Sequence, residues 1–470
     1  MMSPRLTLAD VSGRIAYDEP VHGDSGVRRA RRLVSGAPRG FAVVVLLLAL
    51  LAAPARASGP IAHREVLPNR IVLLVAERPA VPIVAVRVYS RAGAVLDPAD
   101  KGGVAGLMGG LLTRGTAKRS GPELDSAIEF VGGSLESGAG RDGLSVSLAA
   151  LKRDLALGLD LMAEVLLSPT FPEAEFKRKV AQTQAAIKRS EEDPGTVAGR
   201  ALARRVYPNH PYGRPAEGTI ESVGKITRDD VVRFHKEHVR PDTTIIAVVG
   251  AITVDEARRE ILARFGGWPK PSAPAASVAE AAAGGPPTEE KIKRDLTQAT
   301  LMFGRQSIRQ TDPDYFPLAV ASYVLGGGSA SRLYARVREE GGLAYAVYAY
   351  NNPGRYGAST AVSAATRTAE VAKVVDIVRD EMARLGREPV SDRELKLAKD
   401  YLIGSFPLRL DTSGKVADFI VSIESQGLGL DYADRYKERI AKVTAADVQR
   451  VSAKFFAPDT YNRVVVGALP

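Results

Sequence analysis

The chain has 470 residues, a formal net charge of +10 and no cysteine. Its length allows more than one domain, and the lack of cysteine excludes disulfides, cysteine-ligated metals and a lipid-anchored cysteine. Its basic residues are scattered and aromatic residues make up only 6% of it, which does not indicate a nucleic-acid-binding protein.

The segment 1–57 is typical of a leader. Five arginines between positions 28 and 39 precede a continuous apolar run from Phe41 to Ala53, and Ala55-Arg56-Ala57 follows as a small-x-small cleavage site. The run is short for a transmembrane helix, so we expect a secretory signal peptide and export to a bacterial periplasm. An uncleaved membrane anchor is the alternative. No stable membrane span is expected once the leader is cleaved.

The next part of the chain predicts strands first and paired helices afterwards, from hydrophobic periodicity and from glycine and proline stops. The expected elements are strands at 71–76 and 83–90, a glycine-rich helix from Gly102 to a turn at Gly115, a short helix from Ser120 to Gly132, strands at 134–137 and 144–151, and helices at about 153–167 and 172–192.

The second part of the chain predicts a similar order of elements. They are a strand at 297–304, a helix from Asp312-Pro313 to Gly326–Gly328, a short helix from Ser329 to Glu339, a hairpin of strands at 343–350 and 357–364, an amphipathic helix from Val371 that ends at Gly386, and a helix that Ser391 and Glu394 begin as a capping box.

An internal repeat supports two homologous halves. Segments 226–251 and 443–468 align without a gap, so that Thr227 matches Thr444 and Gly250 matches Gly467, and they are identical at 11 of 26 positions. Each copy predicts a helix, a Pro-Asp turn and a buried strand. Because strands and helices do not alternate strictly, we expect an α+β fold in which each half has an antiparallel-rich sheet covered by helices.

A stretch rich in alanine, glycine and proline lies between the halves, at residues 271–290. It has too little apolar bulk to form a core of its own, which is typical of a linker. The expected organisation is therefore a leader at 1–57, an N-terminal domain at 58–270, this linker, and a C-terminal domain at 291–470.

The glycine-rich stretch at 102–120 closely resembles the zinc helix of the pitrilysin/insulinase-type (inverzincin) metallopeptidases, which include the mitochondrial processing peptidase. The shared frame is Gly103, Ala105, Leu112, Gly115, Thr116, Arg119 and Ser120. Where this family has its two zinc-binding histidines, the chain has Gly106 and Gly110, and Gly109 replaces the general-base glutamate. Glycine offers neither a metal ligand nor a base.

The third zinc ligand of the family is also missing. The run from Gln184 to Pro194 resembles the family's glutamate-bearing helix, and the ligand position falls on Ala185 or Ala186. Loss of all three ligands and the base together predicts a chain with no catalytic residues and no metal of its own. The resemblance, which covers the chain from about Val66 to Gly467, also implies two halves that close like a clamshell over a peptide.

Histidines elsewhere offer one other candidate metal pair, His235 and His238. They have helical spacing but no complete set of ligands nearby, and the repeat places Ser452 and Phe455 at the equivalent positions. Ordinary helix residues are therefore the favoured interpretation. His210, in a His-Pro-Tyr-Gly loop that the family shares, is expected to form a structural turn.

The segment from Gly326 to Tyr345 resembles the family's second-half motif nearly completely. The resemblance implies that Arg338 and Tyr345 bind substrate and stabilise the tetrahedral intermediate, since a guanidinium and a phenol can both donate to an oxyanion. The alternative is an Arg338 ion pair with a neighbouring glutamate and a Tyr345 packed in the core. The glycines at 326–328 predict a close-packed turn rather than an anion site.

Some members of this family work as two-chain enzymes in which one subunit holds zinc and the other supplies the arginine and tyrosine. We therefore expect a non-catalytic, peptide-binding subunit of an exported heterodimeric peptidase, with zinc in a homologous partner. The alternatives are a scaffolding member of the family, with no role in proteolysis, and an unrelated enzyme on the same fold. No nucleophile elbow, P-loop or dinucleotide fingerprint supports the last of these.

Overall fold

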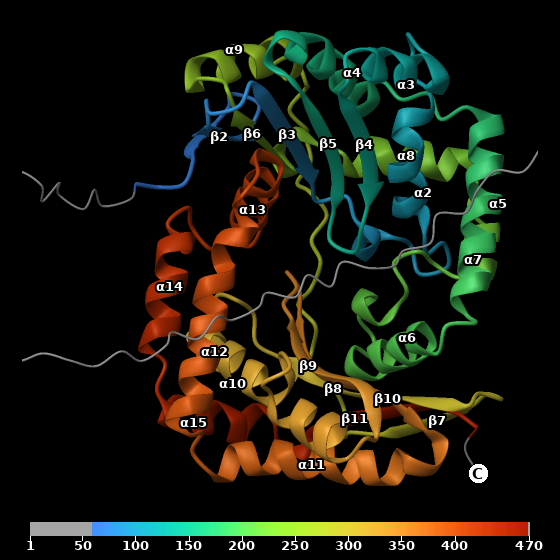
Figure 1. Cartoon of the computed structure of the whole chain (residues 1–470). Coiled ribbons are helices and arrows are strands. Elements are labelled where there is room, and N and C mark those ends of the chain that lie inside the picture. The colour runs from blue at the N-terminus through green and yellow to red at the C-terminus, as the bar shows by residue number, and fades with distance from the viewer. Residues whose placement is uncertain (1–58, 469–470) are drawn as a thin grey trace, which may run out of the picture. The chain divides into compact units, whose positions relative to one another are not determined.

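A computed structural model describes residues 59–468, so the expected leader lies outside the described residues. Two sheets organise this part of the chain (Figure 1). The first has the order β1-β2-β6-β3-β5-β4 and the second the order β7-β11-β8-β10-β9. The strands are β1 His63–Val66, β2 Val72–Glu77, β3 Ile83–Ser90, β4 Ser134–Ala139, β5 Leu144–Leu151, β6 Thr244–Gly250, β7 Glu289–Lys293, β8 Gln298–Ser307, β9 Ala344–Asn352, β10 Ala358–Arg367 and β11 Asn462–Gly467.

Helices cover the two sheets, which confirms the expected α+β class. In the first half they are α2 Val104–Leu111, α3 Gly121–Phe130, α4 Leu155–Leu167, α5 Glu173–Ser190, α6 Pro194–Val206, α7 Ile220–Gly224, α8 Arg228–His238 and α9 Val254–Phe265. In the second half they are α10 Tyr315–Gly326, a π-helix at Tyr334–Glu340, α11 Val371–Arg387, α12 Asp392–Ser405, α13 Ser413–Ser425, α14 Tyr432–Lys442 and α15 Ala445–Phe455. Among these described helices, none is both long and apolar enough to cross a membrane.

The repeat seen in the sequence is one inner strand of each sheet, β6 or β11, with the helix before it. Strand β6 lies parallel to β2 and antiparallel to β3, and β11 has the same relation to β7 and β8. Both strands are buried almost throughout, as their apolar sequences predict. The two halves therefore share one sheet topology, and β1 is an additional edge strand of the first half.

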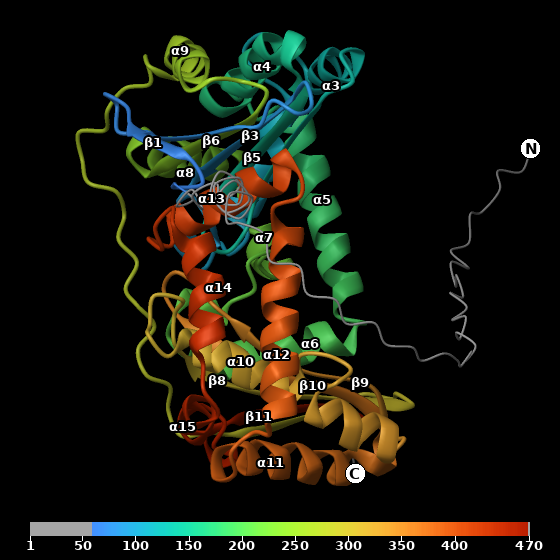
Figure 2. The same ribbon diagram turned by 60° about the vertical axis from the view of Figure 1, so that its left-hand side comes forward.

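Each half also supplies one helix to the sheet of the other. Helix α13 packs Val416, Ile420 and Val421 on β2 and β6 of the first sheet. Helix α6 packs Ala198, Leu202 and neighbouring side chains on β8 and β11 of the second sheet. Figure 2 shows α13 against the first sheet and α6 beside the second. This reciprocal packing ties the halves together through apolar contacts.

Three local expectations differ from the structure. Helix α10 begins at Tyr315 rather than at Asp312, because the Asp312 carboxylate accepts a hydrogen bond from the Asp314 amide (2.8 Å) and forms a turn first. Gly386 lies within α11 and does not end it; a Cβ there would stand 2.9 Å from the Ala453 Cα, so the glycine allows α15 to pack closely. The short helix expected from Ser329 is largely a π-helix.

The linker is fastened to the first half although it has no helix or strand before β7. Arg240 donates to the carbonyls of Ala273 and Pro274, at 2.6 and 3.2 Å. His210 accepts from the Tyr212 amide through Nδ1, which leaves its Nε2 to donate to the Ala279 carbonyl (3.1 Å). His210 thus forms the structural turn expected of it and also holds the linker.

Candidate functional site

Helix α2 carries the degenerate zinc positions, and a buried carboxylate caps it. Asp97 accepts hydrogen bonds from the backbone amides of Gly103 (2.6 Å) and Ala105 (3.0 Å). Burial raises the pKa of Asp97 to about 7, although both hydrogen bonds favour the charged form. Gly103 has φ +103, a conformation that favours glycine, and so lets the chain turn into the helix.

The three glycines of α2 meet three different surroundings. A Cβ at Gly109 would overlap the backbone nitrogen of Ala139 in edge strand β4, and Ser137 donates to the Gly109 carbonyl (2.7 Å). A Cβ at Gly110 would stand 2.5 Å from Cε and 2.8 Å from Nζ of Lys179, which reaches across from α5. A Cβ at Gly106 would meet nothing within 4 Å. Strand β4 therefore leaves no space for a side chain at Gly109, the position of the family's general base.

The expected third-ligand positions lie on α5, where Ala185 and Ala186 are both exposed. Neither methyl group can bind a metal. Within residues 59–468, no group of three histidine, cysteine or acidic side chains is placed to hold a metal ion. Zinc consequently does not fit the site on α2: the ligand atoms are missing, Lys179 occupies the space beside Gly110, and strand β4 fills the space of the general base at Gly109.

The alternative metal pair on α8 is part of the first-half packing. His235 Nε2 forms a hydrogen bond with the Leu166 carbonyl (3.0 Å), and its ring meets Phe171 edge-on. His238 packs edge-on against Phe234. Burial lowers the pKa of both histidines. Their surroundings support the interpretation that both are ordinary residues of the repeated helix.

The second candidate constellation brings together Arg338 and Tyr345. The Arg338 Nη1 donates to the Tyr345 carbonyl (3.1 Å), and its guanidinium lies over the rings of Tyr345 and Tyr334, at 4.4 and 5.0 Å from their centroids. Tyr345 is skipped in the pairing of β9 with β10, where Ala365 pairs with Ala346 and Thr366 with Ala344. This bulge turns its side chain outwards, because a bulge breaks the alternation of a strand.

Both alternative roles for this pair are wrong. The Tyr345 side chain is 80% exposed and does not belong to the core. Arg338 forms no ion pair with Glu339, Glu340 or any other acid that the structure describes, and it stacks between two aromatic rings instead. Tyr334 is a member of this site that sequence reasoning missed, although its helical spacing from Arg338 was a signal.

Two sequence profiles match this chain. Residues 72–220 match "Insulinase (Peptidase family M16)" and residues 225–402 match "Peptidase M16 inactive domain". The chain belongs to the insulinase family of peptidases. It is a peptidase-like member that lacks the catalytic motif of the family, as the residues of α2 and α5 make plain.

Relatives of this insulinase-family chain include both proteases and a non-peptidase. An uncharacterized zinc protease of Streptomyces coelicolor is 28% identical over 397 residues, 83% of this chain and 86% of that protein. A non-peptidase homolog of Helicobacter pylori is 24% identical over 409 residues, 87% and 94% of the two chains.

Solved structures have the same fold. A peptidase M16 inactive domain from Pseudomonas fluorescens matches with a TM-score of 0.82 at 25% identity, over 87% of this chain and 98% of that one. A protease of Helicobacter pylori matches with a TM-score of 0.81 at 18% identity, over 87% of this chain and all of that one, which shows the fold alone.

The residues around α2 that this chain shares with the insulinase family make structural contacts. Arg119 forms an ion pair with Glu164, which is only 9% exposed, and the Thr116 hydroxyl donates to the same carboxylate (3.3 Å). Ser120 forms a capping box with Glu123 and begins α3. These contacts need no metal, so the frame has a reason to persist after the zinc ligands are gone.

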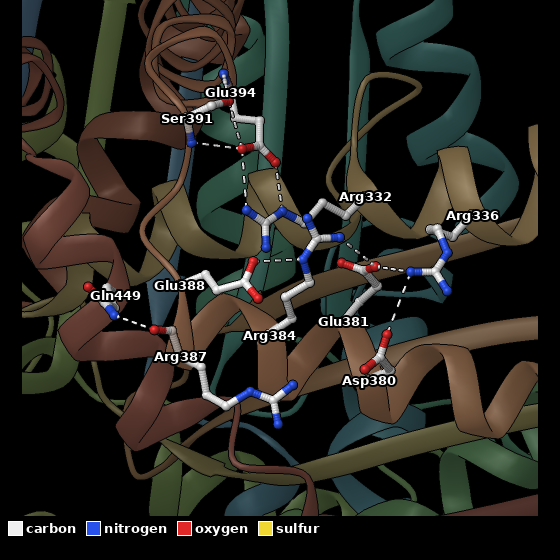
Figure 3. A network of polar contacts seen from close by, with 10 residues as sticks. All are labelled: Arg332, Arg336, Asp380, Glu381, Arg384, Arg387, Glu388, Ser391, Glu394 and Gln449. Atoms are coloured by element: carbon white, nitrogen blue, oxygen red, sulfur yellow. Dashed lines mark hydrogen bonds and ion pairs between the residues drawn. The ribbon is translucent and has the colours of Figure 1, made fainter.

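Ion pairs hold the π-helix that carries Arg338 against α11, and the residues just before it against α12. Figure 3 shows Arg336 directed at Glu381 and Asp380, and Arg332 directed at Glu394. Glu381 is fully buried and also lies 3.5 Å from Arg384. π-Helical turns are rare and occur frequently at functional sites, and this one extends over 7 residues. The network fixes the element from which Arg338 projects.

The glycines after α10 form a close-packed turn, as expected. A Cβ at Gly326 would overlap the Ala349 backbone nitrogen, and one at Gly327 would stand 2.5 Å from the Tyr323 Cα. Neither position leaves room for an anion.

Proposed function

We propose that this protein is a non-catalytic, peptide-binding subunit of an exported heterodimeric zinc peptidase, which supplies Arg338 and Tyr345 to a zinc-bearing partner of the same family. The observation that carries the proposal is the pairing of an arginine that no described carboxylate neutralises with an exposed tyrosine on a β-bulge. A scaffold would not need such a pair, because neither side chain supports the core.

The chemistry of the pair suits a substrate carbonyl. Arg338 uses one nitrogen for the Tyr345 carbonyl, and the rest of its donors remain for a ligand. The two rings restrict the guanidinium, so less side-chain entropy is lost when it binds. A guanidinium and a phenol hydroxyl held together can stabilise an oxyanion, and in known enzymes one such donor contributes about 100- to 1,000-fold in kcat.

The zinc is expected in the partner and not in this chain. Without a ligand at Gly106, Gly110, Ala185 or Ala186, the chain has no means to hold a metal-bound water, and Gly109 has no carboxylate to take its proton. The subunit alone should bind peptides without cleaving them. The likeness to a non-peptidase homolog supports this part of the proposal. Export, most simply to a bacterial periplasm, rests on the leader at 1–57.

The test is peptidase activity on an unstructured peptide, with zinc content measured alongside. The full chain is assayed alone and after co-expression with a homologue from the same genome that retains the zinc motif. We expect activity only in the mixture, and a loss of about 100-fold or more on Arg338→Ala or Tyr345→Phe. Tyr348→Phe, also exposed on β9, and Arg393→Ala on α12 are the matched controls.

Three outcomes would overturn the proposal. Zinc and activity in the chain alone would show a complete enzyme. Activity in the mixture that survives Arg338→Ala and Tyr345→Phe would remove the pair from catalysis. A stable complex whose activity equals that of the partner alone would favour the scaffolding alternative.

A further inference from the structure

A lysine ammonium lies where the second zinc-binding histidine of the family would begin. Lys179 projects from α5 onto α2, and its Nζ would stand 2.8 Å from a Cβ at Gly110. The side chain is half-buried, and none of the carboxylates that the structure describes pairs with it. The missing side chain at Gly110 is what admits the lysine. A positive charge therefore remains at the site after the metal ligands are lost.

A pocket of about 540 Å³ adjoins this lysine, between α5 and the loop at Glu217. Its lining includes Lys179, Arg189, Gln182, Thr183 and Ser190. Its one acidic group, Glu217, is already paired with Arg200. Arg189, like Lys179, has no carboxylate partner in the described chain. The pocket thus offers two unpaired cations, together with the Gln182 amide and the Thr183 hydroxyl, and no free acid; the Ser190 hydroxyl already donates to the Ile187 carbonyl (2.6 Å).

The open face of α2 lies beside this charge. Gly106 and Gly110 are one helical turn apart and share a face, and only Gly110 is covered by Lys179. A chain that lies along α2 can therefore approach the ammonium from the side of Gly106. An ammonium has three donors and no lone pair, so it binds an anionic oxygen strongly but cannot hold and ionise a water as zinc does.

We propose that Lys179 binds a carboxylate of a bound peptide in the pocket beside the degenerate zinc site. The carboxylate belongs to the C-terminus of the peptide or to an acidic side chain, and both present the same two oxygens. This inference rests on the proposed peptide-binding function and names the class of peptide that the subunit prefers. Lys179 supplies a positive charge where the family has a metal ion, so the subunit can still bind a carboxylate but cannot hydrolyse the peptide.

The test is fluorescence anisotropy with a labelled, unstructured peptide in three forms. One has a free C-terminal carboxylate and an internal glutamate, one has a C-terminal amide, and one has glutamine for glutamate. They are titrated with the full chain, alone and with its partner. We expect about tenfold weaker binding for whichever change removes the recognised carboxylate, and the same loss on Lys179→Gln.

The control is Lys177→Gln, since Lys177 pairs with Glu173 and, two residues from Lys179 on the same helix, lies on nearly the opposite face. Lys179→Arg, which retains the charge, should retain part of the preference. Lys179→Gln should not weaken the peptide form that already lacks the recognised carboxylate, because the two changes remove one interaction.

The outcomes separate this inference from the proposed function. Peptides that bind with one Kd in all three forms, whether or not Lys179 is substituted, would overturn the role of Lys179 and leave the peptide-binding function intact. No binding of any form, alone or with the partner, would overturn both. A carboxylate preference that Lys179→Gln leaves unchanged would place the carboxylate elsewhere and would also overturn the inference.

Discussion

The two halves have the same framework but differ at their candidate functional sites. Gly109 on α2 and Gly326 at the end of α10 are equivalent positions when the spacing of the sequence repeat is applied to them, and a Cβ at either would overlap a backbone nitrogen of an edge strand, Ala139 in β4 or Ala349 in β9. The first half therefore closes its helix against its edge strand as tightly as the second half does. Beyond that shared contact, the second half exposes Tyr345 on a bulge.

An ion pair between an arginine and a buried glutamate is also repeated at the same spacing. Arg119 binds Glu164 in the first half, and Arg336 binds Glu381 in the second. Each pair ties the segment after the first helix of its half to the following long helix, α4 or α11. The framework of this chain is therefore maintained by packing and ion pairs that are independent of zinc, so the metal site can be absent without loss of the fold.

The largest expected effect comes from breaking these repeated pairs. Glu381→Ala should lower the free energy of unfolding by up to about 5 kcal/mol, because Arg336 loses a charged hydrogen-bond partner and the fully buried side chain leaves a cavity. Glu164→Ala should lower it by a similar or smaller amount, since Glu164 is not fully buried. Urea unfolding measures both. Asp380→Ala is the control, because Asp380 is half exposed and lies farther from Arg336 (3.5 Å). Equal losses for Asp380 and Glu381 would contradict the role of burial.

Asp97 before α2 should make the stability of the chain depend on pH. Asp97 is buried with a pKa of about 7, whereas Asp314, at the equivalent position of the second half, pairs with Arg450 at the surface (2.8 Å). Between about pH 4 and pH 7 the folded chain keeps the Asp97 proton and the unfolded chain does not. The free energy of unfolding should therefore fall as the pH rises through this window, by up to about 4 kcal/mol from this group.

The measurement is urea unfolding of the wild type and of Asp97→Asn at several pH values. The difference in the free energy of unfolding between the wild type and Asp97→Asn should change between pH 4 and pH 7 and stay constant above pH 7. Asp314→Asn should leave this dependence in place. A wild-type chain that gains stability from Asp97 as the pH rises would mean that its two amide hydrogen bonds outweigh its burial.

Restoring the zinc motif should damage the first half before it restores metal binding. Gly109→Glu is expected to lower the free energy of unfolding by up to about 3 kcal/mol, because the new Cβ forces β4 away from α2. Thermal unfolding and zinc content of a variant with histidines at 106 and 110 and glutamate at 109 measure both effects. Tight zinc binding by that variant without loss of stability would show that β4 yields easily, and that only the ligands were lost.

The sequence predicted the repeat, the bounds of β3 and β5 and the capping box at Ser391, because these depend on local periodicity and side-chain chemistry. Helix α6 was missed although Asp193-Pro194, a cap followed by proline, marks its start. Lys179 over Gly110 could not be predicted, since it depends on how α5 crosses α2. The bulge that exposes Tyr345 could not be predicted either, because it is set by the register of β9 on β10.

The smallest expected effect is a stabilisation, at Gly106, which is the open position of the degenerate zinc site. Gly106→Ala should raise the free energy of unfolding by about 1 kcal/mol, because alanine favours a helix and nothing lies within 4 Å of its Cβ. The same change at Gly109 should destabilise the chain. The two substitutions should therefore change the free energy of unfolding in opposite directions, although both glycines lie on one helix. Differential scanning calorimetry of the two variants resolves the difference. If both changes stabilise the chain, β4 does not close the site, and the loss of zinc would rest on the ligands alone.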